Sequence, residues 1–170
     1  PFSIDDQQAI VETKAKSFDC TIMDMSDDIA YGVHDLEDAI ALRLVSREQM
    51  TKDVPPSLWD EFISNMAADY PCEYQRFGQS LYEGFLEQLF ENGTKAQIGR
   101  LVHYMISNTY VQVRERFEEP MYRHAATIRP AASALLSALK KFIRNRVIRA
   151  PEVQQLRFKG QQMIVQLFAY

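Results

Sequence analysis

Residues 17–45 read SFDCTIMDMSDDIAYGVHDLEDAIALRLV, and this stretch decides the fold class. Because an α-helix turns once in about 3.6 residues, apolar side chains at intervals of three and four residues predict a helix with one buried face. Such side chains recur here at Ile22, Met25, Ile29, Val33, Leu36 and Ile40. We therefore expect one long amphipathic helix from about Ser17 to Val45.

Helix-start and helix-stop signals follow this segment closely. Ser46-Arg47-Glu48-Gln49 is a capping-box pattern and predicts a short helix, which Val54-Pro55-Pro56 ends. Ser57 is expected to cap a helix from Leu58 to about Ala68. Beyond the turn at Tyr70-Pro71, a further helix is predicted from about Tyr74 to Glu91, with Asn92-Gly93 as a left-handed C-cap.

The second half of the chain shows the same kind of pattern. Thr94-Lys95-Ala96-Gln97 resembles a second capping box and predicts a helix to about Phe117, which Pro120 breaks. Pro130 is placed to open a helix through about Ile148, and Pro151 to start the last one. No alternating segment is long enough to demand a strand. We expect an all-α fold of about six or seven helices in a single domain spanning 1–170.

The composition is that of an ordinary globular protein, with 46% apolar and 25% charged residues and only six glycines. Cys20 and Cys72 are isolated in the sequence, which indicates free thiols in a reducing cytosol, although a disulfide stays open. No apolar run approaches the roughly 20 residues that span a bilayer, and no N-terminal signal pattern is present. These features predict a cytoplasmic protein with no membrane partner.

Charge is unevenly distributed along the chain. Residues 1–110 hold 8 Lys and Arg against 19 Asp and Glu, whereas residues 111–170 hold 11 against 4. The first segment therefore has a net charge of −11 and the second of +7. Such asymmetry could steer an anionic ligand to one half, or it could make the two halves attract each other in the fold.

The acidic side of the first helix is the strongest candidate for a functional site. Asp27, Tyr31 and Asp35 are four residues apart and fall within about 80° of one another on a helix. No Lys or Arg lies between Lys16 and Arg43 to balance the carboxylates, and like charges one turn apart repel. Carboxylates are natural ligands for Mg²⁺ or Mn²⁺, and a phenol beside a carboxylate suits a sugar hydroxyl. The alternative is a solvated acidic face with no ligand.

Gly32 lies in the middle of the same predicted helix. Glycine costs a helix interior about 1 kcal/mol relative to alanine. Its presence indicates the close approach of a ligand or of another backbone.

At this point the sequence resembles a known family. Residues 16–20 (KSFDC) and 27–40 (DDIAYGVHDLEDAI) look like the deoxyguanosine triphosphate triphosphohydrolase-like proteins of bacteria, which are members of the HD superfamily. Residues 150–154 (APEVQ) and 158–164 (FKGQQMI), through Leu167-Phe168, resemble that family's C-terminal helix. The resemblance covers nearly the whole chain.

The resemblance implies an activity and roles for three residues. The family cleaves a deoxynucleoside triphosphate (dNTP) into deoxynucleoside and inorganic triphosphate at a divalent metal, Mg²⁺ or Mn²⁺ being expected. Asp27 matches the final aspartate ligand of that metal, and Tyr31 and Asp35 match residues that contact the deoxyribose 3′-hydroxyl. Members of the family are oligomeric and some bind single-stranded DNA, so a homo-oligomer and single-stranded DNA are expected partners besides the dNTP.

The sequence departs from the family pattern before Asp27. The family's other metal ligands, a histidine and a His-Asp pair, precede the final aspartate, but none of the 26 residues before Asp27 is a histidine. His34-Asp35 follows Asp27, and Asp35 is better assigned to the sugar. No catalytic set is therefore complete in this chain. We expect a C-terminal fragment of a longer hydrolase that is inactive alone, the alternative being a non-catalytic helical module for oligomerisation or binding single-stranded nucleic acid.

Two histidines, a tryptophan and a basic run are further candidates for binding a ligand. His103 and His124 are interpreted as packed or hydrogen-bonded residues, and Trp59 as a core or interface anchor. A basic run is expected to form a solvated helix face or to bind phosphate or single-stranded nucleic acid, and it comprises Lys140, Lys141, Arg144, Arg146 and Arg149.

Overall fold

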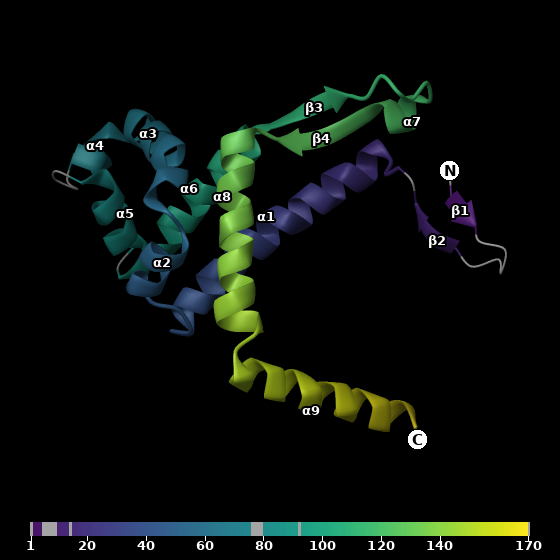
Figure 1. The fold of residues 1–170 in the computed structure, drawn as a ribbon. Coiled ribbons are helices and arrows are strands. Elements are labelled where there is room, and N and C mark those ends of the chain that lie inside the picture. The colour runs from purple at the N-terminus through teal and green to yellow at the C-terminus, as the bar shows by residue number, and fades with distance from the viewer. Residues whose placement is uncertain (1, 5–9, 14, 76–79, 92, 170) are drawn as a thin grey trace.

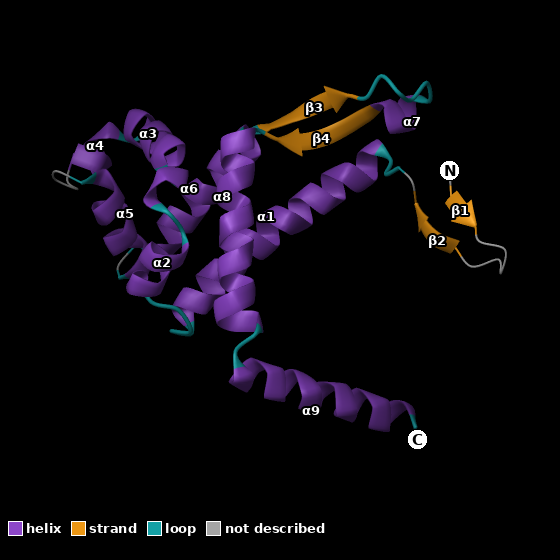
Figure 2. Cartoon of the chain, in the orientation of Figure 1, coloured by secondary structure: helices purple, strands orange, loops and turns teal. Residues whose placement is uncertain are grey.

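Helices make up most of the chain and confirm the predicted all-α class (Figure 2). The computed structural model describes residues 2–4, 10–13, 15–75, 80–91 and 93–169. The described part also holds two small antiparallel sheets of two strands each, which the sequence patterns did not predict. One of them, β1 (Phe2–Ile4) with β2 (Ile10–Thr13), lies beyond the start of the first helix (Figure 1).

The long amphipathic helix is observed as α1 (Phe18–Ala41). The Ser17 hydroxyl accepts a hydrogen bond from the Cys20 amide and caps its first turn. The helix ends before the predicted Val45 because Arg43 adopts a left-handed φ of 55°, and the Leu44 amide donates back to the Ala39 carbonyl. Most of the predicted apolar positions are buried, but Ile22 is exposed.

Five helices and a 3₁₀ turn follow and pack together on one side of α1 (Figure 1). They are α2 (Arg47–Asp53), η1 (Pro56–Leu58), α3 (Asp60–Asp69), α4 (Pro71–Tyr74), α5 (Leu81–Phe90) and α6 (Thr94–Ser107). The Ser46 capping box is confirmed. The prediction of Ser57 as a cap was wrong, because Ser57 lies inside η1 and Trp59 occupies the N-cap of α3.

Three predictions about the segment between α4 and α6 were also wrong. The helix expected from about Tyr74 begins instead at Leu81, where the Ser80 hydroxyl accepts from the Glu83 amide. Gly93 has a φ of −130° and is the N-cap of α6 rather than a left-handed C-cap, while Asn92 lies outside the described residues. The Thr94 hydroxyl donates to the Leu89 carbonyl, so it forms no capping box.

The helix predicted to run to Phe117 ends at Ser107, which is the largest error of the sequence analysis. Residues 109–113 form β3 (Thr109–Val113), which pairs antiparallel with β4 (His124–Ile128) through α7 (Pro120–Arg123). Three of the five β3 residues are β-branched, and such side chains favour strands. The hairpin lies over the first turns of α1 (Figure 1).

Two further helices complete the chain. Pro130 is at the first position of α8 (Pro130–Ile143), as predicted, and α8 packs across α1. It continues as a π-helical segment, η3 (Arg144–Ile148). Pro151 starts α9 (Pro151–Phe168), also as predicted, and this helix projects away from the rest of the molecule (Figure 1).

The core lies where α1, α3, α5, α6 and α8 meet. Its centre is an aromatic cluster whose ring centroids are 5.1–5.9 Å apart, formed by Trp59, Phe62, Phe85 and Tyr104. Trp59 is fully buried, which confirms its interpretation as a core anchor. Cys20 and Cys72 are exposed free thiols, as predicted.

No helix among the described residues combines the length and the apolar character that crossing a bilayer requires.

Candidate functional site

The predicted site residues occupy the outward face of α1. Asp27 is exposed, whereas Tyr31 and Asp35, one and two turns further along, are half-buried. On the opposite side of the same helix, Val33 and Leu36 are fully buried. The structure therefore brings the three residues together on one face, as their spacing predicted. Their roles toward a metal and a sugar stay predictions.

The carboxylates of this face influence one another electrostatically. Partial burial raises the pKa of Asp35 above its ordinary value of 3.8, and the neighbouring charges of Asp38 and Asp27 raise it further. The His34 ring opposes these effects slightly. The folded structure therefore disfavours the charged form of the Asp35 carboxyl group. Carboxyl groups with a perturbed pKa are common at functional sites.

Asp24, which shares the angular sector of these three residues, and Asp28, which lies beside it, have cationic partners. Lys16 Nζ lies 2.6 Å from Asp24 Oδ2, and Lys140 on α8 forms an ion pair with Asp28. Lys140 Nζ also lies 5.9 Å from the centroid of the Tyr31 ring. By contrast, Asp27 makes no ion pair with any residue that the structure describes. Its carboxylate remains free to accept a cation from solution.

Gly32 is explained by packing between helices. A Cβ atom at this position would lie 2.5 Å from Leu136 Cδ1 and 3.3 Å from Lys140 Cγ, both on α8. The sequence indicated the close approach of a ligand or a backbone, and the approaching element is α8. Gly32 therefore positions Lys140 beside Tyr31 and is no evidence for a ligand.

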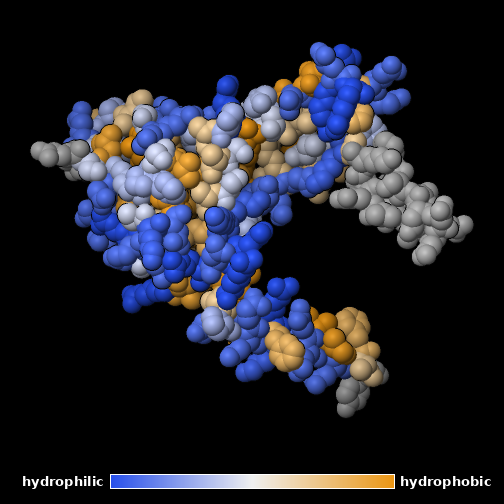
Figure 3. All heavy atoms as spheres, viewed as in Figure 1, coloured by the Kyte–Doolittle hydropathy of each residue, from blue (hydrophilic) through white to orange (hydrophobic). Residues whose placement is uncertain are grey.

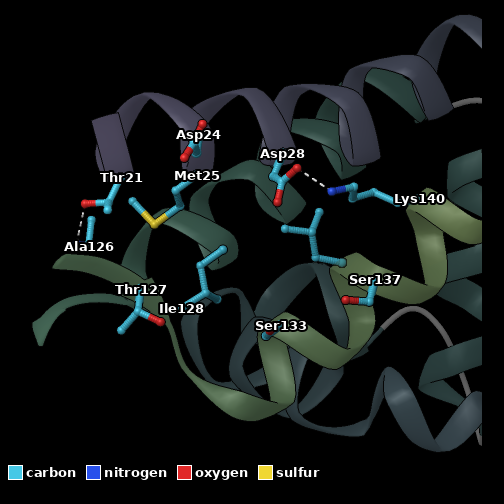
Figure 4. A pocket seen from close by; sticks show the side chains of 11 residues that line it. Thr21, Asp24, Met25, Asp28, Ala126, Thr127, Ile128, Ser133, Ser137 and Lys140 are labelled. Carbon is cyan, nitrogen blue, oxygen red and sulfur yellow. Dashed lines mark hydrogen bonds and ion pairs between the residues drawn. The ribbon is translucent and has the colours of Figure 1, made fainter. Parts of the chain in front are cut away.

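A cavity of about 290 Å³ opens beside the acidic face, between α1, β4 and α8 (Figure 4). Asp24 and Asp28 line it from α1, while Ser133, Ser137 and Lys140 line it from α8. The Thr21 hydroxyl accepts a hydrogen bond of 2.9 Å from the Ala126 amide and ties α1 to β4 at its edge. Asp27, Tyr31 and Asp35 do not line this cavity. Local sequence patterns could not reveal this cavity, because its walls come from segments about a hundred residues apart.

The described residues contain no group of three or more His, Cys, Asp and Glu side chains that could hold a metal ion. Asp27 is an exposed, unpaired carboxylate and suits the role of one oxygen ligand. A metal held here would need further ligands beyond these residues.

The three histidines have local partners. His34 Nδ1 lies 3.5 Å from Glu37 Oε2, and His124 Nδ1 lies 3.3 Å from the Pro120 carbonyl oxygen. His103 is exposed, so its interpretation as a packed residue was wrong, although Ser107 Oγ lies 3.4 Å from its Nε2. None of these contacts indicates a metal ligand.

The predicted basic run divides between two faces. Lys140 pairs with Asp28 on α1, and Arg146 pairs with Asp53 on α2, so each joins the basic half of the chain to the acidic half. Of the two interpretations of the charge asymmetry, these pairs support attraction between the halves. Lys141 and Arg144 remain exposed.

Known proteins share sequence similarity with this chain and test its resemblance to the triphosphohydrolase-like proteins. Residues 126–170, which include most of β4 and all of α8 and α9, match the family model HD_assoc, described as a phosphohydrolase-associated domain. A deoxyguanosinetriphosphate triphosphohydrolase-like protein of Shewanella pealeana is 39% identical over 159 residues, which cover 92% of this chain. The chain is a relative of the deoxyguanosinetriphosphate triphosphohydrolase-like proteins. The resemblance seen in the acidic helix and the tail is thereby confirmed.

Other triphosphohydrolase-like relatives give the same result. A Shewanella baltica protein is 39% identical over 163 residues, covering 93% of this chain, and a Shewanella halifaxensis protein is 38% identical over 159 residues, covering 92%. The chain spans about a third of the length of these relatives, 33% in each case. The chain is thus similar to proteins named as triphosphohydrolase-like and, in its C-terminal part, to a phosphohydrolase-associated domain.

Proposed function

We propose that this chain supplies part of the active site of a metal-dependent hydrolase that converts a dNTP and water into deoxynucleoside and inorganic triphosphate. The observation that carries the proposal is the row of Asp27, Tyr31 and Asp35 on one outward face of α1. The 39% identity to triphosphohydrolase-like proteins over 92% of the chain supports it.

In this proposal Asp27 holds a divalent metal, Mg²⁺ or Mn²⁺. When bound, such an ion activates water and offsets negative charge on a phosphoryl group. Asp27 suits this role because its carboxylate is exposed and makes no ion pair with a described residue, unlike Asp24 and Asp28. A cation beside Asp27 would also relieve the repulsion that Asp27 exerts on Asp35.

Tyr31 and Asp35 orient the nucleoside in this proposal. The Tyr31 hydroxyl can donate to or accept from a sugar hydroxyl, and the Asp35 carboxylate can accept from one. Both side chains are half-buried, which limits their motion, and Lys140 lies near the Tyr31 ring. Holding the sugar one and two turns from Asp27 would place the phosphate chain near the metal.

The 170-residue chain alone is expected to be inactive in this proposal. Asp27 is its one proposed metal ligand, and a single carboxylate does not hold a catalytic ion. The remaining ligands would come from the two thirds of the relatives that the chain does not match. Release of triphosphate from dGTP by this chain alone would contradict this part of the proposal.

The proposal is tested with a chimeric protein in which this chain replaces the matching third of the Shewanella pealeana relative. Triphosphate release from dGTP is measured in the presence of Mn²⁺. Asp27→Asn should lower kcat at least about 100-fold, because a metal ligand is lost. The matched control Asp24→Asn, which removes an exposed carboxylate one turn earlier on α1, should stay within about threefold. Equal activity of the two variants would refute the role of Asp27.

The exposure of α9 favours a second candidate function, a helical module for self-association. Large apolar side chains on this helix are 57–89% exposed, among them Leu156, Met163, Ile164, Leu167 and Phe168 (Figure 3). Light scattering would report a dimer or larger assembly that Leu156→Glu dissociates. A monomer at all concentrations would remove this candidate.

A further inference from the structure

A second cavity, of about 430 Å³, lies between the end of α2 and the C-terminal part of α8 with η3. It is separate from the outward face of α1 and from the cavity beside it. Its lining is charged and polar except for the buried ring of Phe142, and comprises Lys52, Asp53, Lys141, Phe142, Asn145 and Arg146.

Arg146 and Asp53 join the two walls. Arg146 Nε donates to Asp53 Oδ2 at 2.6 Å, and its Nη2 donates to Oδ1 at 3.1 Å. This bidentate pair has a defined geometry and keeps α2 and η3 at a fixed distance. The Asp53 carboxylate therefore already accepts two charge-assisted hydrogen bonds from Arg146.

Positive charge exceeds negative charge around Asp53. The Arg146 guanidinium holds the pKa of Asp53 below its ordinary 3.8, and the charges of Lys52 and Lys141 lower it further. Both lysines line the same cavity as this carboxylate. Neither forms an ion pair with any part of the chain that the structure describes, so the lining holds three cationic side chains against one anionic side chain.

The backbone of this wall is unusual. Residues Arg144–Ile148 are π-helical. This conformation is rare in proteins overall, and where it occurs it is often found at functional sites. This segment presents Asn145 and Arg146 on the wall that faces α2. Lys141 lies in the last turn of α8, immediately before the π-helical segment.

We propose that this cavity binds the phosphate groups of a polyphosphate ligand, with Lys52 and Lys141 as its cationic contacts. The Asn145 carboxamide adds a neutral donor, and the Arg146–Asp53 pair sets the spacing of the walls. A multiply charged anion suits the site because two lysines are unpaired within it, and the volume is in the range of small-molecule sites, about 300–1,000 Å³. The proposal does not depend on the proposed hydrolase activity.

The experiment measures binding of inorganic triphosphate to the 170-residue chain by calorimetry. The double variant Lys52→Gln/Lys141→Gln should weaken binding at least about tenfold, because two charge-assisted contacts are lost. The matched control Lys95→Gln/Lys159→Gln removes the same charge from exposed positions on α6 and α9 and should change binding less than about twofold. Thermal melts check that both variants fold.

Two further measurements separate a built site from diffuse attraction. In NMR spectra, the side-chain amide signal of Asn145 should shift as triphosphate is added. A single-stranded oligodeoxynucleotide is the second possible source of phosphate groups. If the oligonucleotide binds in the cavity, triphosphate should compete with it. Equal weakening by the two double variants, no shift of Asn145, or binding of the oligonucleotide without any binding of triphosphate would overturn the proposal.

Discussion

At the scale of single residues, Gly32 determines how closely α1 and α8 approach. A Cβ atom there would lie 2.5 Å from Leu136 Cδ1, whereas one at Gly160 on α9 would meet nothing within 4 Å. Glycine in a helix interior has an intrinsic cost of about 1 kcal/mol relative to alanine. The contact with α8 is therefore a structural reason for a glycine at position 32 and not at position 160.

Gly32→Val should lower the free energy of unfolding by about 1–3 kcal/mol, because the added methyl groups overpack the α1–α8 contact. Gly160→Val is the matched control and should change it by less than about 0.5 kcal/mol. Urea denaturation measures both values. Equal effects of the two substitutions would show that close packing does not explain Gly32.

Asp35 is expected to lower stability at neutral pH. Its pKa is raised by burial, then by Asp38 and Asp27, so its contribution to stability is full below 3.8 and is lost as pH rises through the raised value. Asp35→Asn should therefore increase the urea midpoint at pH 7, and the increase should shrink near pH 3. Glu87→Gln, a substitution at an exposed position of α5, should leave the urea midpoint nearly unchanged both at pH 7 and near pH 3. A lower midpoint for Asp35→Asn at pH 7 would contradict the account.

At the scale of elements, α8 and α9 have opposite surroundings. Leu139 on α8 is fully buried, whereas Leu167 on α9 is 76% exposed. The apolar periodicity of the sequence predicted both helices but not this difference, because periodicity shows which side of a helix is apolar and not what covers it.

Leu139→Ala should cost about 2–5 kcal/mol of unfolding free energy, since it leaves a cavity in the core. Leu167→Ala should cost less than about 0.5 kcal/mol in the monomeric chain. The same deletion is made at both sites, so chemical denaturation at low protein concentration compares them directly. A large cost at Leu167 would show that α9 is buried in solution.

The sequence was informative where local signals agree with the fold. α1, the Ser46 capping box and the prolines that open α8 and α9 were predicted correctly. The β3–β4 hairpin was missed because Thr109–Val113 is mostly exposed and does not alternate between apolar and polar residues, and because its pairing with β4 is not a local contact. The role of Gly93 was predicted wrongly because glycine is common both at the N-cap and at the C-terminal end of helices.

At the scale of the whole molecule, the two oppositely charged halves of the sequence attract each other. Ion pairs from Lys140 to Asp28 and from Arg146 to Asp53 join residues about a hundred positions apart. The sequence could predict that Asp27, Tyr31 and Asp35 share a helix face, because helical spacing is local. It could not predict the neighbours of that face on α8, since these depend on tertiary packing.

In the proposed active site, one face of α1 carries both a metal ligand and the contacts to the nucleoside sugar. The most direct test uses the chain joined to the remaining two thirds of the Shewanella pealeana relative and compares kcat/KM for dGTP and 2′,3′-dideoxyGTP. A site that hydrogen-bonds the 3′-hydroxyl should favour dGTP by orders of magnitude. Tyr31→Phe and Asp35→Asn should each reduce this ratio at least about tenfold. A ratio near one in the unaltered protein, or one that neither substitution changes, would contradict the claim.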